Sequence, residues 1–345
     1  MSKKRGACDE ESNRVIYENS YRCLGNNLRS EKELYKNAYF SLLRAFYPPP
    51  SSFHGLDCTV VKNTHVPVLS CILPINESTK IRMSVGSHNL MIQKKKFCYH
   101  RESVVEIDVH PTCCILFMHN RTVHGGGRSN SLNLRIFSIY GDKDSFACTE
   151  NKNYIGKFVP CDEDCTECVI MKRAKEDRGT LFPNCEYNLK KAKLFEEIGD
   201  YSLYDHGFCV VKVANDVDRA VKNQALMLGN NEQSGVRFHS LGQEEFIASK
   251  EIGSRDSLDF GTHLDATTFI DKKFKCTYMN DFLKKCNDNI CEYLSSKFKT
   301  AYELKGKTIL RSKGIVGNQK LHVDGEPDCS CIQECVGVVN RKCFE

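Results

Sequence analysis

Short β-branched segments separated by turns run from residue 59 to residue 140 and restrict what this chain can fold into. Within Val104–Val109, valine and isoleucine alternate with Glu106 and Asp108, so apolar and charged side chains fall on opposite faces, as in a half-buried strand. Several such segments in succession predict packed β-sheets. The predicted strands of this region are Thr59–Lys62, Val66–Ile75, Val104–Val109, Cys113–Met118 and Leu132–Tyr140.

Two segments with helical periodicity accompany these strands. The first begins at Ser30 and Glu33, which have the spacing of a capping box, and carries an apolar residue at every fourth position until the prolines at 48–50. The second covers about residues 279–300 and also has one apolar face. Both are expected to pack on a sheet, so the predicted class is α+β. Further predicted strands are His206–Val213, Thr308–Arg311 and Lys320–Val323.

The balance of residue types is that of a globular protein. Hydrophobic residues make up 41% and charged residues 27% of the 345 residues, which is outside the range typical of disorder. The net charge of +5 is spread along the chain, so nucleic acid is not favoured as a partner. The first residues lack the apolar stretch of a secretory signal, and no window approaches the ~18 apolar residues of a membrane helix. An intracellular protein, cytoplasmic or nuclear, with no membrane partner is therefore expected.

The most specific pattern surrounds a histidine and an arginine. His124 is followed by three glycines, and Arg135 stands eleven positions later in a predicted strand, where it alternates with Phe137 and Ile139. Arg135 is therefore expected to face an apolar interior, where a guanidinium is costly unless an anion pairs with it. A planar guanidinium can hold a carboxylate through two parallel hydrogen bonds, so the pattern indicates a site for a carboxylate.

This stretch resembles the distal half of the Fe(II)/2-oxoglutarate-dependent dioxygenase fold, especially its phytanoyl- and prolyl-hydroxylase-like branches. The resemblance implies a jelly-roll core, or double-stranded β-helix, with flanking amphipathic helices. It also implies that His124 binds Fe(II) and that Arg135 binds the far carboxylate of 2-oxoglutarate. Upstream, residues 68–76 and the turn at Ser84–His88 look like the strand and turn that precede this half in the family. The alternative interpretation is an ordinary turn at His124 and an ion pair of Arg135 at the edge of the sheet.

An iron site of this family needs a second histidine and a carboxylate on the same face of the metal. A His-x-Asp pair suits a strand, because residues i and i+2 share a face. In the family this pair precedes the distal histidine, whereas here the well-formed pair, His322 and Asp324, comes long after His124. A second pair, His263 and Asp265, has the right local form, but no arginine or lysine follows at a suitable distance from its distal partner.

Two explanations of this reversed order are open. In the first, the chain is a permuted or intertwined jelly roll in which His124, His322 and Asp324 meet at one iron, with Arg135 behind them. In the second, an N-terminal dioxygenase fold has decayed and the C-terminal region is a truncated copy. The first requires His124 and His322 to lie within about 10 Å of each other, because metal–ligand bonds are only about 2 Å long.

These explanations imply different functions. The first predicts a non-haem dioxygenase that hydroxylates an unidentified substrate, which could be a protein, a nucleobase, a lipid or a small metabolite. The second predicts an inactive jelly-roll scaffold or binding protein. Both divide the chain into a polar tail (1–29), a distal half (30–150), a cysteine-containing linker or insert (151–195) and a proximal half or second copy (196–345).

The chain contains 20 cysteines, which in a reducing compartment are thiols or metal ligands. One group in the predicted linker has finger-like spacing and suggests a structural zinc site, although chance clustering is an open alternative in so cysteine-rich a chain. Its members are Cys161, Cys165, Cys168 and Cys185. A weaker candidate near the C-terminus consists of Cys329, Cys331, Cys335 and Cys343.

Overall fold

The structure is a computed structural model that describes residues 67–89, 98–119, 121–142, 158–176, 192–199, 201–230, 238–240, 253–259 and 276–324. Several of the sequence predictions fall outside these residues. Among them are the helix that begins near Ser30, the strand Thr59–Lys62 and the pair His263 and Asp265.

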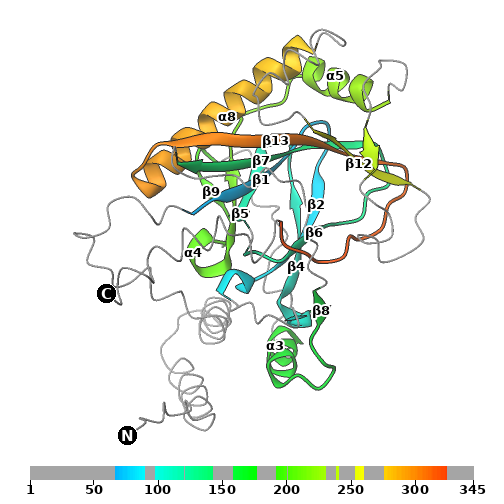
Figure 1. Ribbon diagram of the computed structural model, residues 1–345, viewed down its shortest axis with the longest axis vertical. Coiled ribbons are helices and arrows are strands. Elements are labelled where there is room, and N and C mark those ends of the chain that lie inside the picture. Colours follow the sequence, from blue (N-terminus) through cyan, green and yellow to red (C-terminus); the bar gives the residue numbers. More distant parts are fainter. Residues whose placement is uncertain are drawn as a thin grey trace, which may run out of the picture.

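An antiparallel sheet of eight strands forms the centre of the molecule (Figure 1). The order of its strands is β11-β12-β13-β7-β1-β5-β10-β9, so neighbours in space are often distant in sequence. Its strands are β1 (Leu69–Pro74), β5 (Cys113–Met118), β7 (Asn133–Asp142), β9 (Glu197–Ile198), β10 (Phe208–Lys212), β11 (His239–Ser240), β12 (Ser254–Asp259) and β13 (Tyr302–Lys313).

A smaller sheet of three strands, in the order β4-β2-β6, faces the large one. Its strands are β2 (Thr79–Ser84), β4 (Val104–Val109) and β6 (His124–Gly126). An apolar core fills the space between the two sheets, because every second side chain of each strand points inward. Ile72, Ile115 and Phe117 of the large sheet belong to this core together with Ile81 and Ile107 of the small one. A separate parallel pair joins β3 (Cys98–Tyr99) to β8 (Val159–Pro160).

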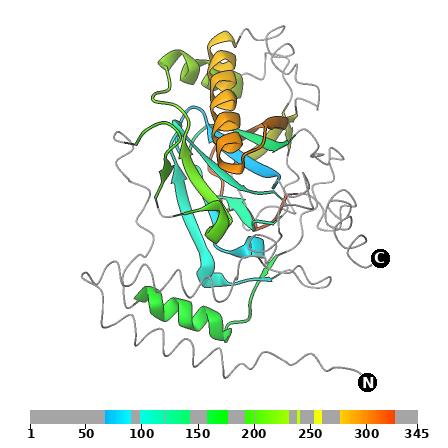
Figure 2. The same cartoon turned by 90° about the vertical axis from the view of Figure 1, so that its left-hand side faces the viewer.

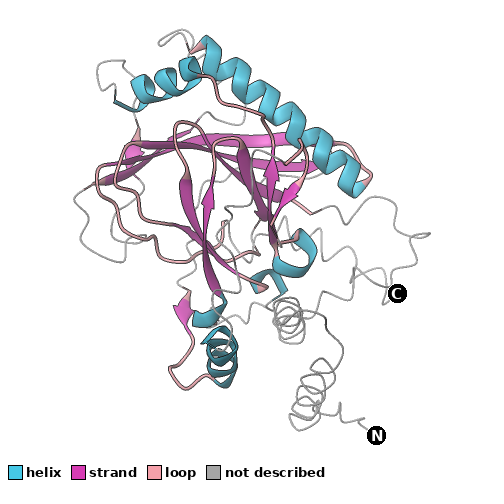
Figure 3. Ribbon diagram, turned by 180° about the vertical axis from the view of Figure 1, so that it is seen from behind, coloured by secondary structure: helices cyan, strands magenta, loops and turns pink. Residues whose placement is uncertain are grey.

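The opposite face of the large sheet is covered by two helices, α5 (Arg219–Asn230) and α8 (Thr277–Phe298) (Figure 3). Apolar residues of α8 recur at helical spacing and are buried against the sheet. The shorter helices are α3 (Thr166–Glu176), which lies at the far end of the molecule from α8, and α4 (Leu203–His206) (Figure 2). Single 3-10 turns, η2 (Ser87–Asn89) and η3 (Arg101–Ser103), complete the described helices.

The longest pairing in the large sheet joins β7 to β13. It runs from Asp142 opposite Tyr302 to Asn133 opposite Ser312, with one irregularity between Leu304 and Gly306. Strands from both ends of the described chain therefore share one sheet. The protein is of mixed α and β structure, mostly sheet with few helices. Within the described ranges, no helix is both long and apolar enough to cross a membrane.

The sequence predicted several elements closely and missed others. Val104–Val109 and Cys113–Met118 are strands with the predicted bounds. The predicted linker or insert at 151–195 contains β8 and α3, so part of it has regular secondary structure. Residues 320–323 form an isolated bridge at His322 and not the regular strand that was predicted. The sequence analysis did not find β2, β12 or α5.

The packing of α8 gives a test of this arrangement. Leu294→Ala removes a fully buried side chain from the core between α8 and the large sheet, and it should lower the free energy of unfolding by about 2–5 kcal/mol. Tyr278→Ala, at a 61% exposed position of the same helix, should change it by only about 0.5 kcal/mol or less. Urea unfolding of both variants measures the difference, and equal effects would contradict the burial of this face.

Candidate metal centre

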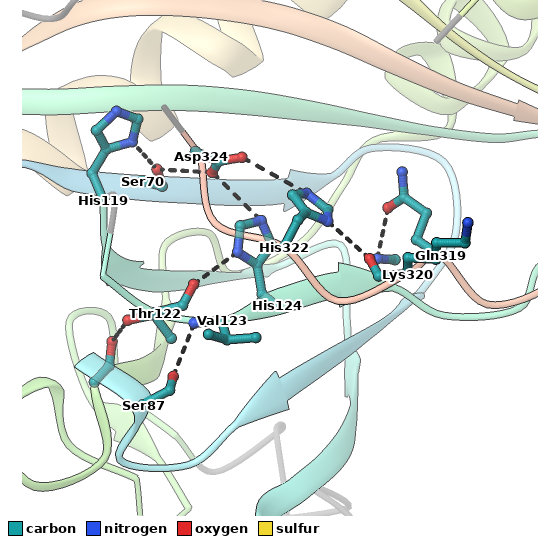
Figure 4. Close-up of polar contacts among 12 residues, drawn as sticks. Ser70, Ser87, His119, Thr122, Val123, His124, Gln319, Lys320, His322 and Asp324 are labelled. Atoms are coloured by element: carbon teal, nitrogen blue, oxygen red, sulfur yellow. Dashed lines mark hydrogen bonds and ion pairs between the residues drawn. The ribbon is translucent and has the colours of Figure 1, made fainter. Parts of the chain in front are cut away.

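Three side chains with metal-binding atoms converge between the two sheets. They are His124 of β6 and His322 and Asp324 of the C-terminal described segment, and one ligand atom of each lies within 4.8 Å of the others. The imidazole rings of His124 and His322 have centroids 4.6 Å apart. Nε2 of His124 is 3.4 Å from Oδ2 of Asp324, and Nε2 of His322 is 3.9 Å from Oδ1. Figure 4 shows both rings directed toward the carboxylate.

Backbone pairing explains why these side chains share one face. The amide of His124 donates to the carbonyl of His322 at 2.8 Å, and the amide of His322 donates to the carbonyl of His124 at 2.8 Å. Two residues that exchange both bonds lie directly opposite each other in an antiparallel ladder, so their side chains point to the same side. Asp324 is two residues beyond His322 and follows it onto that side.

The glycines after His124 let the two segments approach closely. A Cβ atom at Gly126 would lie 2.7 Å from both Nη1 of Arg255 and Oε1 of Gln319, and one at Gly125 would lie 3.1 Å from the carbonyl oxygen of Lys320. Because no Cβ atom occupies this position, the amide of Gly126 donates a hydrogen bond to Oε1 of Gln319 at 2.7 Å. The glycine run therefore has a packing reason, which is the passage of residues 319–322 beside β6.

Each imidazole is oriented by a carbonyl oxygen behind it. Nδ1 of His124 lies 3.0 Å from the carbonyl oxygen of Thr122, and Nδ1 of His322 lies 2.9 Å from that of Lys320. A carbonyl oxygen can only accept, so Nδ1 is the donor in both neutral rings and Nε2 keeps its lone pair. A hydrogen bond of this kind behind a histidine is typical of metal ligands, because it fixes the tautomer and the ring orientation.

The surroundings of the two histidines keep them neutral. His124 is 4% and His322 7% exposed, and the ring of Phe117 lies 4.4 Å from that of His124. Desolvation lowers the pKa of His124 to about 4 and that of His322 to about 4, and the neighbouring His124 further lowers the latter. Both imidazoles are therefore neutral at pH 7, as metal binding requires.

A polar chain continues from the carboxylate to the large sheet. Oγ of Ser70 donates to Oδ2 of Asp324 at 3.4 Å and lies 2.8 Å from Nδ1 of His119 (Figure 4). Ser70 belongs to β1, so this contact joins the segment that carries His322 to a strand from the other end of the described chain. The sequence analysis did not identify Ser70 or His119, since neither belongs to a recognisable motif.

Arg135 lies on the inward face of β7, as its alternation with Phe137 predicts. It is 4% exposed, and its guanidinium donates to Oγ of Ser312 at 2.9 Å and to Oδ1 of Asn133 at 3.5 Å. Both partners are neutral. Burial lowers the pKa of Arg135 to about 9, and the positive charge of Arg255 contributes to this shift. Among the described residues, no carboxylate pairs with Arg135, so an anion would be stabilised beside it.

The structure also brings together three of the predicted zinc ligands. Cys161, Cys165 and Cys168 lie near one another, and the fourth residue of this group is His100, which the sequence analysis missed. No local spacing could have linked His100 to cysteines more than sixty residues away. Cys185 lies outside the described residues, as do Cys329, Cys331, Cys335 and Cys343.

Comparison of the chain with models of protein families, with curated proteins and with solved structures finds no match.

The depressed pKa values of His124 and His322 predict a pH-dependent stability of the metal-free protein. As the pH falls from 6.5 to about 4, these histidines bind protons in the unfolded chain but remain neutral in the folded chain. The free energy of unfolding should therefore decrease over this range and stay constant above pH 6.5. The loss should amount to a few kcal/mol in total. Urea unfolding at several pH values measures it. His322→Asn, which cannot titrate, should lose a large part of the slope, and an unchanged slope would refute the assignment.

Proposed function

We propose that this protein is an Fe(II)/2-oxoglutarate-dependent dioxygenase with a permuted jelly-roll core, which hydroxylates a C–H bond of its substrate. The observation that carries the proposal is the convergence of His124, His322 and Asp324, whose ligand atoms lie within 4.8 Å of one another between the two sheets. Two histidines and one carboxylate with open positions opposite them form the ligand set of non-haem Fe(II) oxygenases.

The sheet order supports a jelly roll. Four neighbouring strands of the large sheet, β13-β7-β1-β5, would form one layer of the jelly roll, and β4-β2-β6 together with the bridged segment at His322 would form the other. In this interpretation the jelly roll would start at β13 and end at β7. In that order of strands, β1 would follow the segment that ends at Asp324. The hydrogen bond from Ser70 of β1 to Asp324 joins the two. Permutation of a compact domain is tolerated where the joined ends lie close together.

The donor atoms fit a divalent iron. Ligands about 2 Å from a metal and at right angles to each other are about 3 Å apart, and the separations of 3.4 and 3.9 Å from Asp324 to the two imidazoles need only small adjustments. In both neutral rings the proton is on Nδ1, so the lone pair is on Nε2, and the hydroxyl of Ser70 donates to Oδ2 of Asp324. Bound Fe(II) would supply oxidising chemistry with O₂ as the oxidant, so that one oxygen atom hydroxylates the substrate and the other enters succinate as 2-oxoglutarate loses CO₂.

Arg135 fits the far carboxylate of 2-oxoglutarate. Ile139 pairs with Ser70, and Arg135 lies four residues further along the same face of β7, roughly 13 Å away at about 3.3 Å per residue. A five-carbon diacid and an extended arginine side chain together span such a distance. Arg255 lies opposite Ser312, the serine that binds Arg135, and adds positive charge to the same inward face. A dicarboxylate would relieve the repulsion between the two guanidinium groups.

The residues of this chain would therefore bind the metal, orient its ligands and shield the centre from water. His124, His322 and Asp324 hold the metal, the carbonyl oxygens of Thr122 and Lys320 hold the imidazoles, and buried apolar side chains such as Phe117 exclude water from one side of the centre. The cofactor supplies the chemistry, whereas the protein sets its position and surroundings.

Anaerobic addition of Fe(II) and 2-oxoglutarate tests the metal centre. The wild-type protein should develop a metal-to-ligand charge-transfer band, and His124→Ala, His322→Ala and Asp324→Ala should each abolish it. Iron affinity should fall by more than the roughly 10- to 100-fold that is typical when only a group behind a ligand is changed. His110→Ala, at an exposed histidine, is the matched control and should keep the band.

The outcomes separate the two functions predicted from the sequence. A band that needs all three residues, together with slow 2-oxoglutarate-dependent formation of succinate, supports the dioxygenase. If the wild-type protein develops no charge-transfer band, the dioxygenase proposal is wrong and an inactive scaffold or binding protein is favoured.

Replacement of Arg135 tests the co-substrate site separately from the iron site. Arg135→Gln should leave Fe(II) affinity within a few-fold of wild type but weaken 2-oxoglutarate binding by on the order of 100-fold, because a buried carboxylate would lose its charged partner. Arg135→Lys should lie between the two, since lysine keeps the charge and loses the paired hydrogen bonds. Arg128→Gln, at an exposed arginine, is the control. Unchanged 2-oxoglutarate affinity in Arg135→Gln would exclude this residue from the site.

A further inference from the structure

We infer that the protein holds a structural zinc ion at a second site, bound by His100, Cys161, Cys165 and Cys168. One ligand atom of each residue lies within 4.8 Å of the others. Sγ of Cys161 and Sγ of Cys168 are 3.0 Å apart, and Nδ1 of His100 is 3.3 Å from Sγ of Cys165 and 3.8 Å from Sγ of Cys168. This site is separate from the iron site and does not depend on the function proposed for it.

These separations match a tetrahedral zinc ion. With Zn–S bonds of about 2.3 Å and Zn–N bonds of about 2.0–2.1 Å, neighbouring ligand atoms in a tetrahedron are about 3.5–3.8 Å apart. The two distances from His100 are within about 0.3 Å of these values, whereas the sulfur atoms of Cys161 and Cys168 would have to separate by about 0.8 Å to enclose the metal. Three thiolates and one imidazole form a closed ligand set of the structural kind, which favours zinc over magnesium, calcium or a lone ferrous ion.

The local fold delivers the ligands in pairs. β3 and β8 run parallel, with Tyr99 opposite Pro160, so His100 and Cys161 follow at the same end of the two strands. The amide of Cys161 donates to the carbonyl of Tyr99 at 2.9 Å and fixes this register. The chain then turns, since the amide of Cys165 donates to the carbonyl of Asp162, and enters α3, whose first turn carries Cys168.

A bound metal also explains how the small unit formed by β3, β8 and α3 is stabilised. A parallel pair of two-residue strands and one helix of eleven residues form a small unit, and among the described side chains of this helix only Cys168 and Met171 are buried. The segments around β3 and β8 are far apart in sequence, and one ion bound by residues of both would link them. Small domains that lack a sufficient core are commonly stabilised by a structural metal.

The zinc site lies behind the strands that carry the candidate iron ligands. Val123, Leu321 and Val323 alternate with His124, His322 and Asp324, and form an apolar cluster of their own. Tyr99 and Phe158, which flank the zinc ligands, pack against this cluster. The bound zinc would therefore hold an apolar support on the side of these strands opposite the iron site.

Cobalt substitution of the full-length wild-type protein tests the inference without relying on any variant to fold. Co(II) bound by three thiolates in a tetrahedron gives a thiolate-to-metal charge-transfer band and intense d–d absorption, neither of which the histidine and aspartate of the iron site can produce. The expected result is this spectrum at one equivalent of Co(II), displaced by one equivalent of Zn(II). Only weak absorption, or a protein isolated with iron and sulfide at this site, would overturn it.

Variants then identify the ligands. Cys165→Ser and His100→Ala should lower the zinc content of the purified protein by about one equivalent and remove or alter the cobalt spectrum, whereas Asp324→Ala should leave the spectrum intact. Cys291→Ser, at a half-buried cysteine of α8, is the matched control. Cys185→Ser should also keep the zinc. If Cys185→Ser loses zinc while His100→Ala retains it, His100 is not the fourth ligand and the proposed ligand set is wrong.

Discussion

The arrangement of the candidate iron site depends on one backbone interaction, the reciprocal pair of hydrogen bonds between His124 and His322. This pair joins two parts of the chain that are almost two hundred residues apart, and it does so at the point where the ligands must meet. Since both bonds are made by the peptide backbone, the side chains remain available for a metal. The neighbouring glycines permit the approach, and Gln319 adds a bond to the amide of Gly126.

The distribution of buried charged groups also favours ligand binding between the two sheets. Carboxylate and imidazole groups gather at one place between the sheets, and two guanidinium groups gather at another. Arg135 is bonded to the neutral groups of Ser312 and Asn133, and its strongest electrostatic neighbour is a second cation. Such an interior is costly in the absence of a bound anion, whereas Asp256 and Arg311 on the opposite face of the same sheet form an ion pair. This contrast between Arg135 and the ion-paired Arg311 is the reason for assigning Arg135 to ligand binding.

Sequence reasoning succeeded where the signal is local. Alternation predicted Val104–Val109, and it also predicted the inward face of Arg135, while the His-x-Asp spacing singled out His322 and Asp324. It failed where the outcome depends on pairing over long distances. In β2 the alternation rests on only two apolar residues, Ile81 and Met83, which stand beside the charged Lys80 and Arg82, so the pattern was too short to identify the strand. His100 joins its cysteines only through the parallel pairing of β3 with β8, for which two residues on each side leave no periodic trace.

The pairing of β7 with β13 has a consequence for how the molecule is made. On a ribosome, β7 emerges about 160 residues before β13, and until then one of its edges has no partner in the final sheet. Exposed edges of this kind invite association with other chains, and sheets that close over long sequence separations form slowly. The open edge of β7 therefore waits for its partner while nearly half of the chain is made, and over that period it can pair with the edges of other nascent chains.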